Sequence, residues 1–342
     1  MNKVRVGIVG SGFIAKIHAS AINAIDNAEL AAVCNRNVES ARALADVYGC
    51  KVYADYDLML ADPEIDAIAV CLPSGLHAEY TIRAAKAKKH VICEKPIDTE
   101  IDRAEEMVRV CRKEGIKLSI IMQHRFDEPM LLLKKAIKEG WMGKLVWGAS
   151  RTIWHRDDAY YAPEWRGTWA VDGGGALMIQ AIHYIDLLLS VMGDAKSVSA
   201  KCRTLTHPQI EVEDIGVANI EFENGAIGTI EGTTCSYPGL YAELCVFGEK
   251  GSMIIRNDYL TFYQFEDGPK SEYDAALNVE AANRLHKTMD IEDTSHRRQF
   301  EDFAAAILED RDPEVTGEET LRSLKVIKAI YQASDEKQEI YF

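Results

Sequence analysis

A glycine-rich turn near the start of the chain constrains the fold more than any other feature. Residues 4–15 read VRVGIVGSGFIA, a β-branched run that breaks into a glycine turn and then into a helix-like stretch. Gly10 lets the backbone turn sharply out of the strand, Gly12 leaves room for a pyrophosphate, and Ala15 keeps the helix close to the sheet. The free N–H groups at the start of that helix would face the phosphates. The segment therefore predicts a dinucleotide-binding unit.

Composition excludes several classes of protein. The 342 residues suffice for two domains, and the formal net charge of −15 disfavours binding to nucleic acid or to an anionic membrane surface. The chain has no apolar run of the ~20 residues needed to cross a bilayer and shows no export signal, so we expect a cytoplasmic protein without a membrane partner. The eight cysteines are scattered without a C-x-x-C pair, which predicts buried free thiols and no metal site.

The first part of the chain alternates strand-like and helix-like segments, the pattern of a parallel sheet covered on both faces. We expect an α/β fold with an N-terminal Rossmann domain, a doubly wound parallel sheet, over residues 1–123. The predicted strands are 4–9, 29–34, 51–53, 65–72, 89–94 and 117–122. The predicted helices are 13–25, 38–48, 56–61, 76–87 and 99–114.

After Arg125 the pattern changes to that of an α+β domain with an open, mainly antiparallel sheet, expected over residues 124–342. Short polar turns separate most of its predicted strands, which are 145–154, 195–205, 214–222, 226–235, 241–248, 252–256 and 259–265. The predicted helices are 128–139, one that begins at Gly173, 295–310 and 317–334, and the last two pack back on either domain. We expect a long loop over 267–292. The open face of the sheet is a candidate subunit interface for a homodimer or homotetramer.

The end of the second strand bears on the choice of dinucleotide. The residue twenty positions after Ala15 is Asn35, where NAD-binding proteins carry an acidic residue, and Arg36 follows it. An asparagine accepts a hydrogen bond from a ribose hydroxyl but does not repel a 2′-phosphate, which an arginine can hold. We expect NAD as the cofactor, and NADP stays open.

Several short motifs together resemble one known family. They are Pro73-Ser74-x-x-His77, Glu94-Lys95-Pro96, Arg125-Phe126, Gly173-Gly174-Gly175-x-Leu177 with His183 and Ile185-Asp186, and Glu213-Asp214 to Glu223-Asn224-Gly225. With the glycine turn, these motifs make the whole chain similar to the glucose-fructose oxidoreductase, inositol dehydrogenase and rhizopine catabolism family of NAD(P)-dependent oxidoreductases.

The resemblance implies that Lys95 and His183 are the catalytic residues and that the Lys95–Pro96 bond is cis. The chemistry of the two side chains agrees with these roles. Histidine has a pKa close to working pH and suits removal of a hydroxyl proton, while a lysine ammonium stabilises the developing negative charge on the substrate oxygen. The residues expected to contact the dinucleotide are Gly10, Gly12, Phe13, Ile14, Asn35, Arg36, Leu72, Pro73, Ser74, His77, Glu94, Lys95 and Gln123.

The chain departs from the family pattern at one position. Many members carry an aspartate or asparagine one helical turn before the histidine, and this chain has Ile179 there. Gln180 is adjacent but points about 100° away on an ideal helix. The task of that missing group then falls to Asp186, Asp172 or a group on the preceding loop.

The substrate class is suggested by a loop that mixes aromatic and charged residues over 154–169. Aromatic faces stack on the C–H faces of a polyhydroxylated ring while polar side chains bind its hydroxyls. The arrangement looks like that of members acting on sugar rings, including nucleotide-sugar uronates, so Arg166 or Arg156 would meet a carboxylate or a phosphate. The expected substrate contacts are Lys95, Arg125, His155, Tyr160, Arg166, Trp169, Ile179 and His183.

These observations favour a dehydrogenase that moves a hydride between a secondary ring hydroxyl of a sugar, glycoside or inositol and C4 of the nicotinamide. Two alternatives remain. One is an NAD-dependent glycosidase that works by transient oxidation and elimination, and the other is a non-catalytic dinucleotide-binding sensor of sugars or redox state. Retention of both Lys95 and His183 argues against the sensor.

Overall fold

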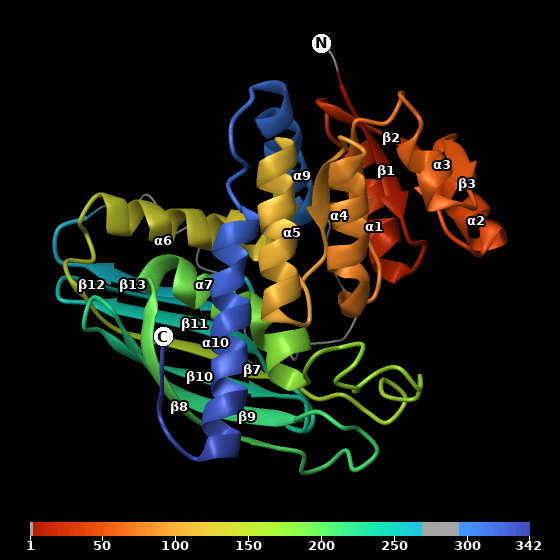
Figure 1. The fold of residues 1–342 in the computed structure, drawn as a ribbon. Helices are drawn as coiled ribbons and strands as arrows, with labels where there is room; N and C mark the ends of the chain where they lie inside the picture. Colours follow the sequence, from red (N-terminus) through yellow and green to blue (C-terminus); the bar gives the residue numbers. More distant parts are fainter. Residues whose placement is uncertain (1–2, 269–293) are drawn as a thin grey trace. The chain divides into compact units, whose positions relative to one another are not determined.

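The computed structural model describes residues 3–268 and 294–342, which divide into two compact units (Figure 1). Of these residues, 3–123 and 294–321 belong to unit 1, and 124–268 and 322–342 belong to unit 2. Most of the expected loop over 267–292 lies outside the described residues. Each unit has its own sheet, as the change of pattern after Arg125 predicts.

Unit 1 contains a six-stranded parallel sheet in the order β3-β2-β1-β4-β5-β6. Its strands are β1 (Val4–Val9), β2 (Ala28–Cys34), β3 (Lys51–Tyr53), β4 (Ala67–Val70), β5 (His90–Cys93) and β6 (Leu118–Ile120). Its connecting helices are α1 (Phe13–Asn23), α2 (Val38–Tyr48), α3 (Tyr56–Leu60), α4 (His77–Lys86) and α5 (Ile101–Glu114). The strand order reverses between β1 and β4, and ligands of such sheets bind outside the carboxyl ends of the strands at that point. The predicted Rossmann fold is confirmed.

A helix from late in the chain completes the core of unit 1. Helix α9 (Thr294–Leu308) packs on α1, β1 and β2, and its Phe300 and Phe303 are each 1% exposed. Their rings join the cluster formed by Ile8 and Ile22, so the first sheet is covered in part by residues almost 300 positions away.

Unit 2 contains an eight-stranded sheet in the order β13-β12-β11-β7-β10-β9-β8-β14. Its strands are β7 (Leu145–Ile153), β8 (Ala195–Arg203), β9 (Ile215–Phe222), β10 (Ile227–Thr233), β11 (Ala242–Gly248), β12 (Gly251–Arg256), β13 (Tyr259–Phe265) and β14 (Ile340–Tyr341). All pairs are antiparallel except β7 with β10, which confirms a mainly antiparallel sheet. The sequence did not predict β14, because two residues are too few to show an alternating pattern.

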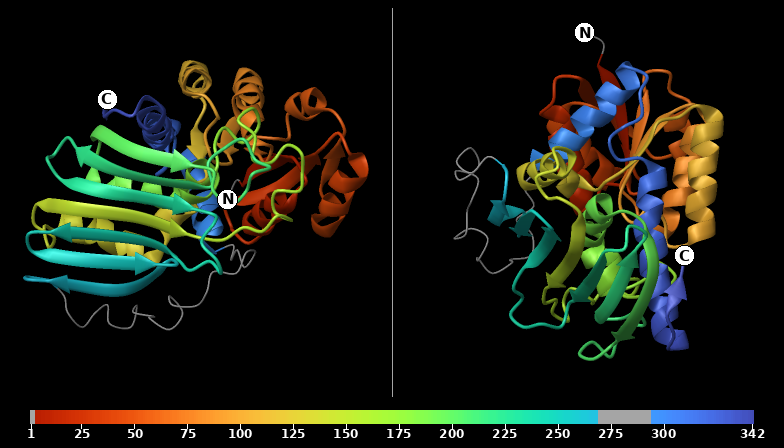
Figure 2. Two further views of the ribbon diagram at one scale, coloured as in Figure 1. Left: turned by 90° about the horizontal axis from the view of Figure 1, so that it is seen from below. Right: turned by 90° about the vertical axis from the view of Figure 1, so that its left-hand side faces the viewer.

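One face of this sheet is covered by α6 (Glu128–Lys138), a π-helix over Ala176–Ala181, and α7 (Ile182–Met192) (Figure 2). Glycines in the strands permit this close approach. A Cβ at Gly148 would lie 2.7 Å from Leu188, and one at Gly232 would lie 2.7 Å from Leu177. Helix α10 (Gly317–Glu336) begins in unit 1 and continues in unit 2.

The thiols of unit 1 are mostly buried, as expected. Cys34, Cys71, Cys93 and Cys111 are buried and unpaired, and burial raises the pKa of each, to about 11 for Cys34 and about 12 for Cys111. Cys50, Cys202 and Cys235 are partly exposed.

Among the described residues, no helix is long and apolar enough to cross a membrane.

Candidate active site

The glycine turn of unit 1 has the geometry that a dinucleotide needs. Gly10 has φ +106°, and a Cβ there would lie 2.1 Å from the carbonyl oxygen of Cys71, so only glycine fits. Gly12 is the N-cap of α1, so no side chain caps the first turn, and among the described residues no atom lies within 4 Å of the position a Cβ would take. Phe13 and Ile14 follow as the first helical residues. The open space and the N–H groups of this first turn fit a pyrophosphate.

Asn35 lies beside the same turn, at the end of β2. Its amide donates to Ser11 Oγ at 2.6 Å, and its side-chain oxygen accepts from the backbone N–H of Asn37 at 3.0 Å. Arg36 is exposed. The structure thus fixes Asn35 against the turn, whereas the choice between NAD and NADP stays a prediction.

Beyond β4, the predicted cofactor contacts surround a buried histidine. His77 is fully buried, with Nδ1 2.7 Å from the carbonyl oxygen of Pro96 and Nε2 2.9 Å from that of Leu72. The imidazole therefore links the backbone at the carboxyl ends of β4 and β5. Next to it, Pro73 is exposed and Ser74 is buried at the start of a 3-10 helix over Ser74–Leu76. Gln123 is buried just after β6.

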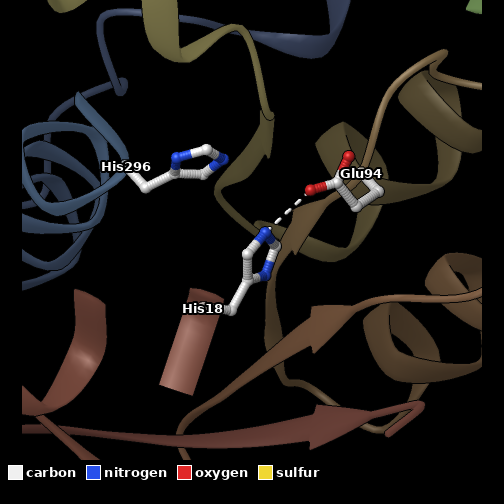
Figure 3. A group of neighbouring side chains, drawn as sticks. All are labelled: His18, Glu94 and His296. Carbon is white, nitrogen blue, oxygen red and sulfur yellow. Dashed lines mark hydrogen bonds and ion pairs between the residues drawn. The ribbon is translucent and has the colours of Figure 1, made fainter. Parts of the chain in front are cut away.

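Glu94 and Lys95 follow β5, and Figure 3 shows the carboxylate of Glu94 hydrogen-bonded to the ring of His18. Glu94 Oε1 accepts from His18 Nε2 at 2.8 Å, and Oε2 accepts from the backbone N–H of Lys95 at 3.1 Å. Burial would raise the pKa of Glu94, but the hydrogen bond from His18 and the charges of His18, His296 and Lys95 outweigh it and lower the pKa to about 2. The result is a buried anion that holds the backbone of half-buried Lys95. The Lys95–Pro96 bond is cis, as expected.

Two histidines of this group were not predicted from the sequence. His18 comes from α1 and His296 from α9, and both are buried. Cys71 Sγ lies 3.1 Å from His18 Nδ1, so both ring nitrogens of this buried histidine have a partner. His18 could have been predicted as a site residue, because it is a polar residue on the buried face of an apolar helix. Nothing in the sequence pointed to His296, because its partners are distant in sequence.

The side chains of unit 2 that surround His183 form a second polar group. His183 lies in the first turn of α7, and the ring of His124 stands edge-on to it at 5.2 Å between centroids. His124 Nδ1 lies 2.8 Å from an oxygen of Asp127 and 3.1 Å from one of Asp258. Burial opposes a charge on His124, but the two carboxylates outweigh it and raise its pKa. Asp127 and Asp258 were not predicted as its partners, because no sequence motif joins them to His124.

Arg125, one of the expected substrate contacts, forms a buried ion pair. Its guanidinium is 3% exposed and binds both oxygens of Asp186, at 2.6 and 2.8 Å. Ser323 Oγ also donates to Asp186 at 3.0 Å. This buried ion pair occupies the arginine and also removes Asp186 as a replacement for the missing acidic residue near His183.

Ile179 and Gln180 do not lie in the ideal α-helix assumed for them. Residues Ala176–Ala181 form a π-helix, which has more residues per turn than an α-helix and so rotates each residue by a smaller angle. Ile179 and Gln180 both line one pocket of unit 2. Its other walls include Tyr160, Tyr161, Arg166 and Val212.

This pocket brings together only part of the predicted substrate contacts. Tyr160, Arg166 and Ile179 line it. The other two aromatic candidates pack elsewhere, His155 edge-on to Tyr237 at 5.3 Å and Trp169 edge-on to Tyr331 at 5.3 Å.

A buried carboxyl group supports the glycine triplet before the π-helix. Glu213 accepts from the backbone N–H groups of Gly175 and Leu177, both at 2.8 Å, and from the hydroxyl of Tyr331 at 2.9 Å. A Cβ at Gly175 would lie 1.8 Å from the Glu213 carbonyl oxygen. Burial raises the pKa of Glu213 to about 7, although the three hydrogen bonds oppose this rise.

The doubly wound sheet, the glycine turn and the lysine that follows a buried anion define a dinucleotide-dependent oxidoreductase. Comparison with known proteins gives the family. Residues 4–122 match the oxidoreductase family with an NAD-binding Rossmann fold, and residues 134–342 match its C-terminal alpha/beta domain. The chain belongs to the glucose-fructose oxidoreductase, inositol dehydrogenase and rhizopine catabolism (Gfo/Idh/MocA) family, which confirms the resemblance and the expectation of an NAD-binding Rossmann domain.

Three relatives illustrate the similarity. The myo-inositol 2-dehydrogenase of Thermotoga maritima is 28% identical over 98% of both chains. The D-glucoside 3-dehydrogenase of Escherichia coli is 33% identical over 67% of this chain and 69% of its own. The crystal structure of the WlbA dehydrogenase of Bordetella pertussis in complex with NADH and UDP-GlcNAcA has 33% identity and a TM-score of 0.87, and covers 100% of this chain and 99% of its own.

Proposed function

We propose that the protein is a dehydrogenase that oxidises a secondary ring hydroxyl of a sugar, glycoside or cyclitol to a ketone, or catalyses the reverse. The observation that carries this proposal is the arrangement at the end of β5, where buried Glu94 holds the backbone of Lys95. The relatives support the substrate class, because their names specify inositol, a glucoside and a nucleotide sugar.

The turn at Gly10 and Gly12 would hold the pyrophosphate of the dinucleotide at the carboxyl ends of the strands of unit 1. Asn35 would hydrogen-bond the adenosine ribose, and the backbone that His77 orders would contact the rest of the cofactor. When bound, the nicotinamide supplies the hydride acceptor.

Lys95 and His183 carry the proton chemistry in this proposal. The Lys95 ammonium donates a hydrogen bond to the substrate oxygen and stabilises the negative charge that develops there. His183 accepts the hydroxyl proton as general base. The ring of His124 lies edge-on to the His183 ring, and Asp258 and Asp127 hold His124 in place.

The Lys95→Ala variant tests this assignment. We expect kcat to fall by about a hundredfold or more, because a positioned acid–base group contributes that much, while the Kd for NADH stays within about twofold. Stopped-flow assays on a panel of inositols, hexoses and glycosides, with NAD and with NADP, measure the first quantity, and fluorescence titration measures the second. The control is Lys86→Ala, at an exposed position at the end of α4. Turnover equal to the wild type would remove Lys95 from the chemistry.

The assembly and location of the protein are part of the same proposal. The outer face of the unit 2 sheet exposes Val217 at 47% and Ile227 at 59%, and such apolar side chains favour contact with a second copy. We propose a homodimer or homotetramer formed through this face, in the cytoplasm.

A further inference from the structure

Three buried polar side chains of unit 1 point toward one another (Figure 3). They are His18 from α1, Glu94 from the end of β5 and His296 from α9, and their exposed fractions are 0%, 7% and 1%. Each offers one nitrogen or oxygen atom, and these three atoms lie within 4.8 Å of one another. Two imidazoles and one carboxylate form a ligand set that zinc and other divalent first-row metals bind.

The spacing of these atoms suits a metal ion. Zinc lies about 2.0–2.1 Å from its nitrogen and oxygen ligands, which places two ligands of a tetrahedron ~3.3 Å apart. His18 Nε2 and Glu94 Oε1 are 2.8 Å apart, so a small side-chain rotation brings this pair to that separation.

Helix α9 brings the third side chain to this pair. The ring of His296 lies 5.8 Å from the ring of His18 between centroids. Phe300, one helical turn further along α9, packs edge-on against the same His18 ring at 5.0 Å. The apolar contact of Phe300 therefore holds the helix where His296 faces His18 and Glu94.

The second polar atom of His18 and of Glu94 is held as metal ligands require. Metal-binding imidazoles and carboxylates are normally oriented by a hydrogen bond to the atom that does not face the metal. Here Cys71 Sγ lies 3.1 Å from His18 Nδ1, and Glu94 Oε2 accepts from the backbone N–H of Lys95 at 3.1 Å. Although burial would raise it, the pKa of Glu94 is about 2, so its carboxylate is an anionic ligand at neutral pH.

We propose that His18, Glu94 and His296 bind a divalent metal ion, with zinc as the expected one, in a structural site. The ion replaces the hydrogen bond between His18 and Glu94, and the ring proton of His18 then lies on Nδ1, beside Cys71 Sγ. Burial raises the pKa of the Cys71 thiol, which keeps the sulfur protonated and outside the ligand set. The expectation of no metal site rested on the cysteines, whereas this group is built from histidines and a glutamate.

The ion joins three elements that are distant in sequence. It fastens α9 to α1 and to the end of β5, and through Glu94 it fixes the backbone of Lys95. The positive charge of Lys95 also acts on Glu94 and opposes a cation, which limits the affinity. Zinc binding in this proposal does not depend on the dehydrogenase activity proposed above.

A group in unit 2 provides an internal comparison. The ligand atoms of His124, Asp127 and Asp258 also lie within 4.8 Å of one another. This group offers one imidazole instead of two, and the side chain of Asp258 is 41% exposed. Both carboxylates contact His124 Nδ1, so a proton on that nitrogen satisfies them without a metal. The buried group of unit 1 is therefore the stronger candidate.

Zinc titration of the chelator-treated, full-length protein tests the proposal. We expect about one equivalent to bind with a Kd of about 1 µM or tighter, measured by calorimetry. At a hundredfold excess over the Kd, zinc should raise the Tm by at least about 5 °C, measured by scanning calorimetry. X-ray absorption at the zinc edge should show two imidazole ligands and no sulfur ligand.

Two variants and two controls locate the metal. His296→Gln and Glu94→Gln should each weaken zinc binding by at least about a hundredfold, because each removes one ligand. His90→Gln, at the opposite end of β5, and Asp258→Asn, in the unit 2 group, should each leave the Kd within about twofold of the wild type. Circular dichroism confirms that each variant is folded.

No binding by the wild type at zinc concentrations up to about 100 µM would overturn the proposal. A zinc spectrum with a sulfur ligand or a single imidazole, or affinity that survives both His296→Gln and Glu94→Gln, would also overturn it. Loss of binding in Asp258→Asn would place the metal in unit 2 instead. The measurements on the wild type test the proposal even where a variant does not fold.

Discussion

At the scale of single residues, Glu213 shows how burial changes the chemistry of a carboxyl group. Its pKa rises from 4.5 to about 7, so the folded protein binds a proton there that the unfolded chain releases at lower pH. The stability that this protonated form contributes is complete below about pH 4.5 and is lost as the pH rises through about 7.

The Glu213→Gln variant should therefore lose this pH dependence. Between pH 4.5 and 7.5 we expect the free energy of unfolding of the wild type to fall by roughly 3 kcal/mol relative to the variant. Urea unfolding followed by tryptophan fluorescence measures it, because all five tryptophans belong to unit 2, as Glu213 does. Glu221→Gln, at a partly exposed position of β9, controls for the loss of a carboxyl group. Parallel stability curves for wild type and variant would contradict this account.

Residue by residue, the sequence predicted the site only where a local motif exists. The glycine turn and Glu94-Lys95-Pro96 are contiguous, so spacing sufficed to identify them. His124 with Asp127 and Asp258, and His18 with Glu94 and His296, are brought together by folding. No pattern of spacing encodes them. The ion pair of Arg125 with Asp186 was not predicted, because a charged side chain gives no sign in the sequence that a buried partner neutralises it.

At the scale of elements, the segment formed by β1, the glycine turn and α1 allows the binding role of a glycine to be tested apart from its role in folding. Gly12 has φ −74°, and nothing crowds a Cβ there, so Gly12→Ala should change the stability by less than about 0.5 kcal/mol. The methyl group would occupy the space for the pyrophosphate, and we expect the Kd for NADH to rise at least tenfold, measured by fluorescence titration.

Gly115→Ala is the matched control, with the opposite expectation for stability and for binding. Gly115 ends α5 with φ +71° in open space, so alanine there should cost about 1 kcal/mol of stability and leave the Kd for NADH unchanged. If Gly12→Ala bound NADH as tightly as the wild type, the pyrophosphate would have to lie elsewhere.

The longer elements were predicted closely because their apolar periodicity covers many residues. Strands β1 to β6 match their predicted ranges to within two residues at every end. The π-helix at Ala176–Ala181 was missed, because its apolar residues fit an α-helix equally well and only the packing of Leu177 on the sheet glycines reveals the difference. The parallel pairing of β7 with β10 was also beyond local pattern, because their connection spans more than 70 residues.

At the scale of the whole molecule, the outer sheet face makes the assembly testable. Val217 on β9 and Ile227 on β10 share that face, since Val217 pairs with Glu231 and Ile227 with Glu221. Val217→Asp with Ile227→Asp should place two charges in the proposed interface and convert the oligomer to monomers, measured by size-exclusion chromatography with light scattering.

The control for this experiment is Val47→Asp, at a 70% exposed position of α2 in unit 1, which should leave the mass unchanged. A double variant that keeps the mass of the wild type would place the subunit contact on another surface.

The thiols within unit 1 have a practical consequence. Thiolate is the reactive form, and burial both hides the sulfur atoms of Cys71 and Cys93 and raises their pKa. Alkylation by a small electrophile must wait until the Rossmann sheet opens. The rate of labelling at each of these cysteines, measured by mass spectrometry, therefore reports how often unit 1 opens locally in the wild-type protein.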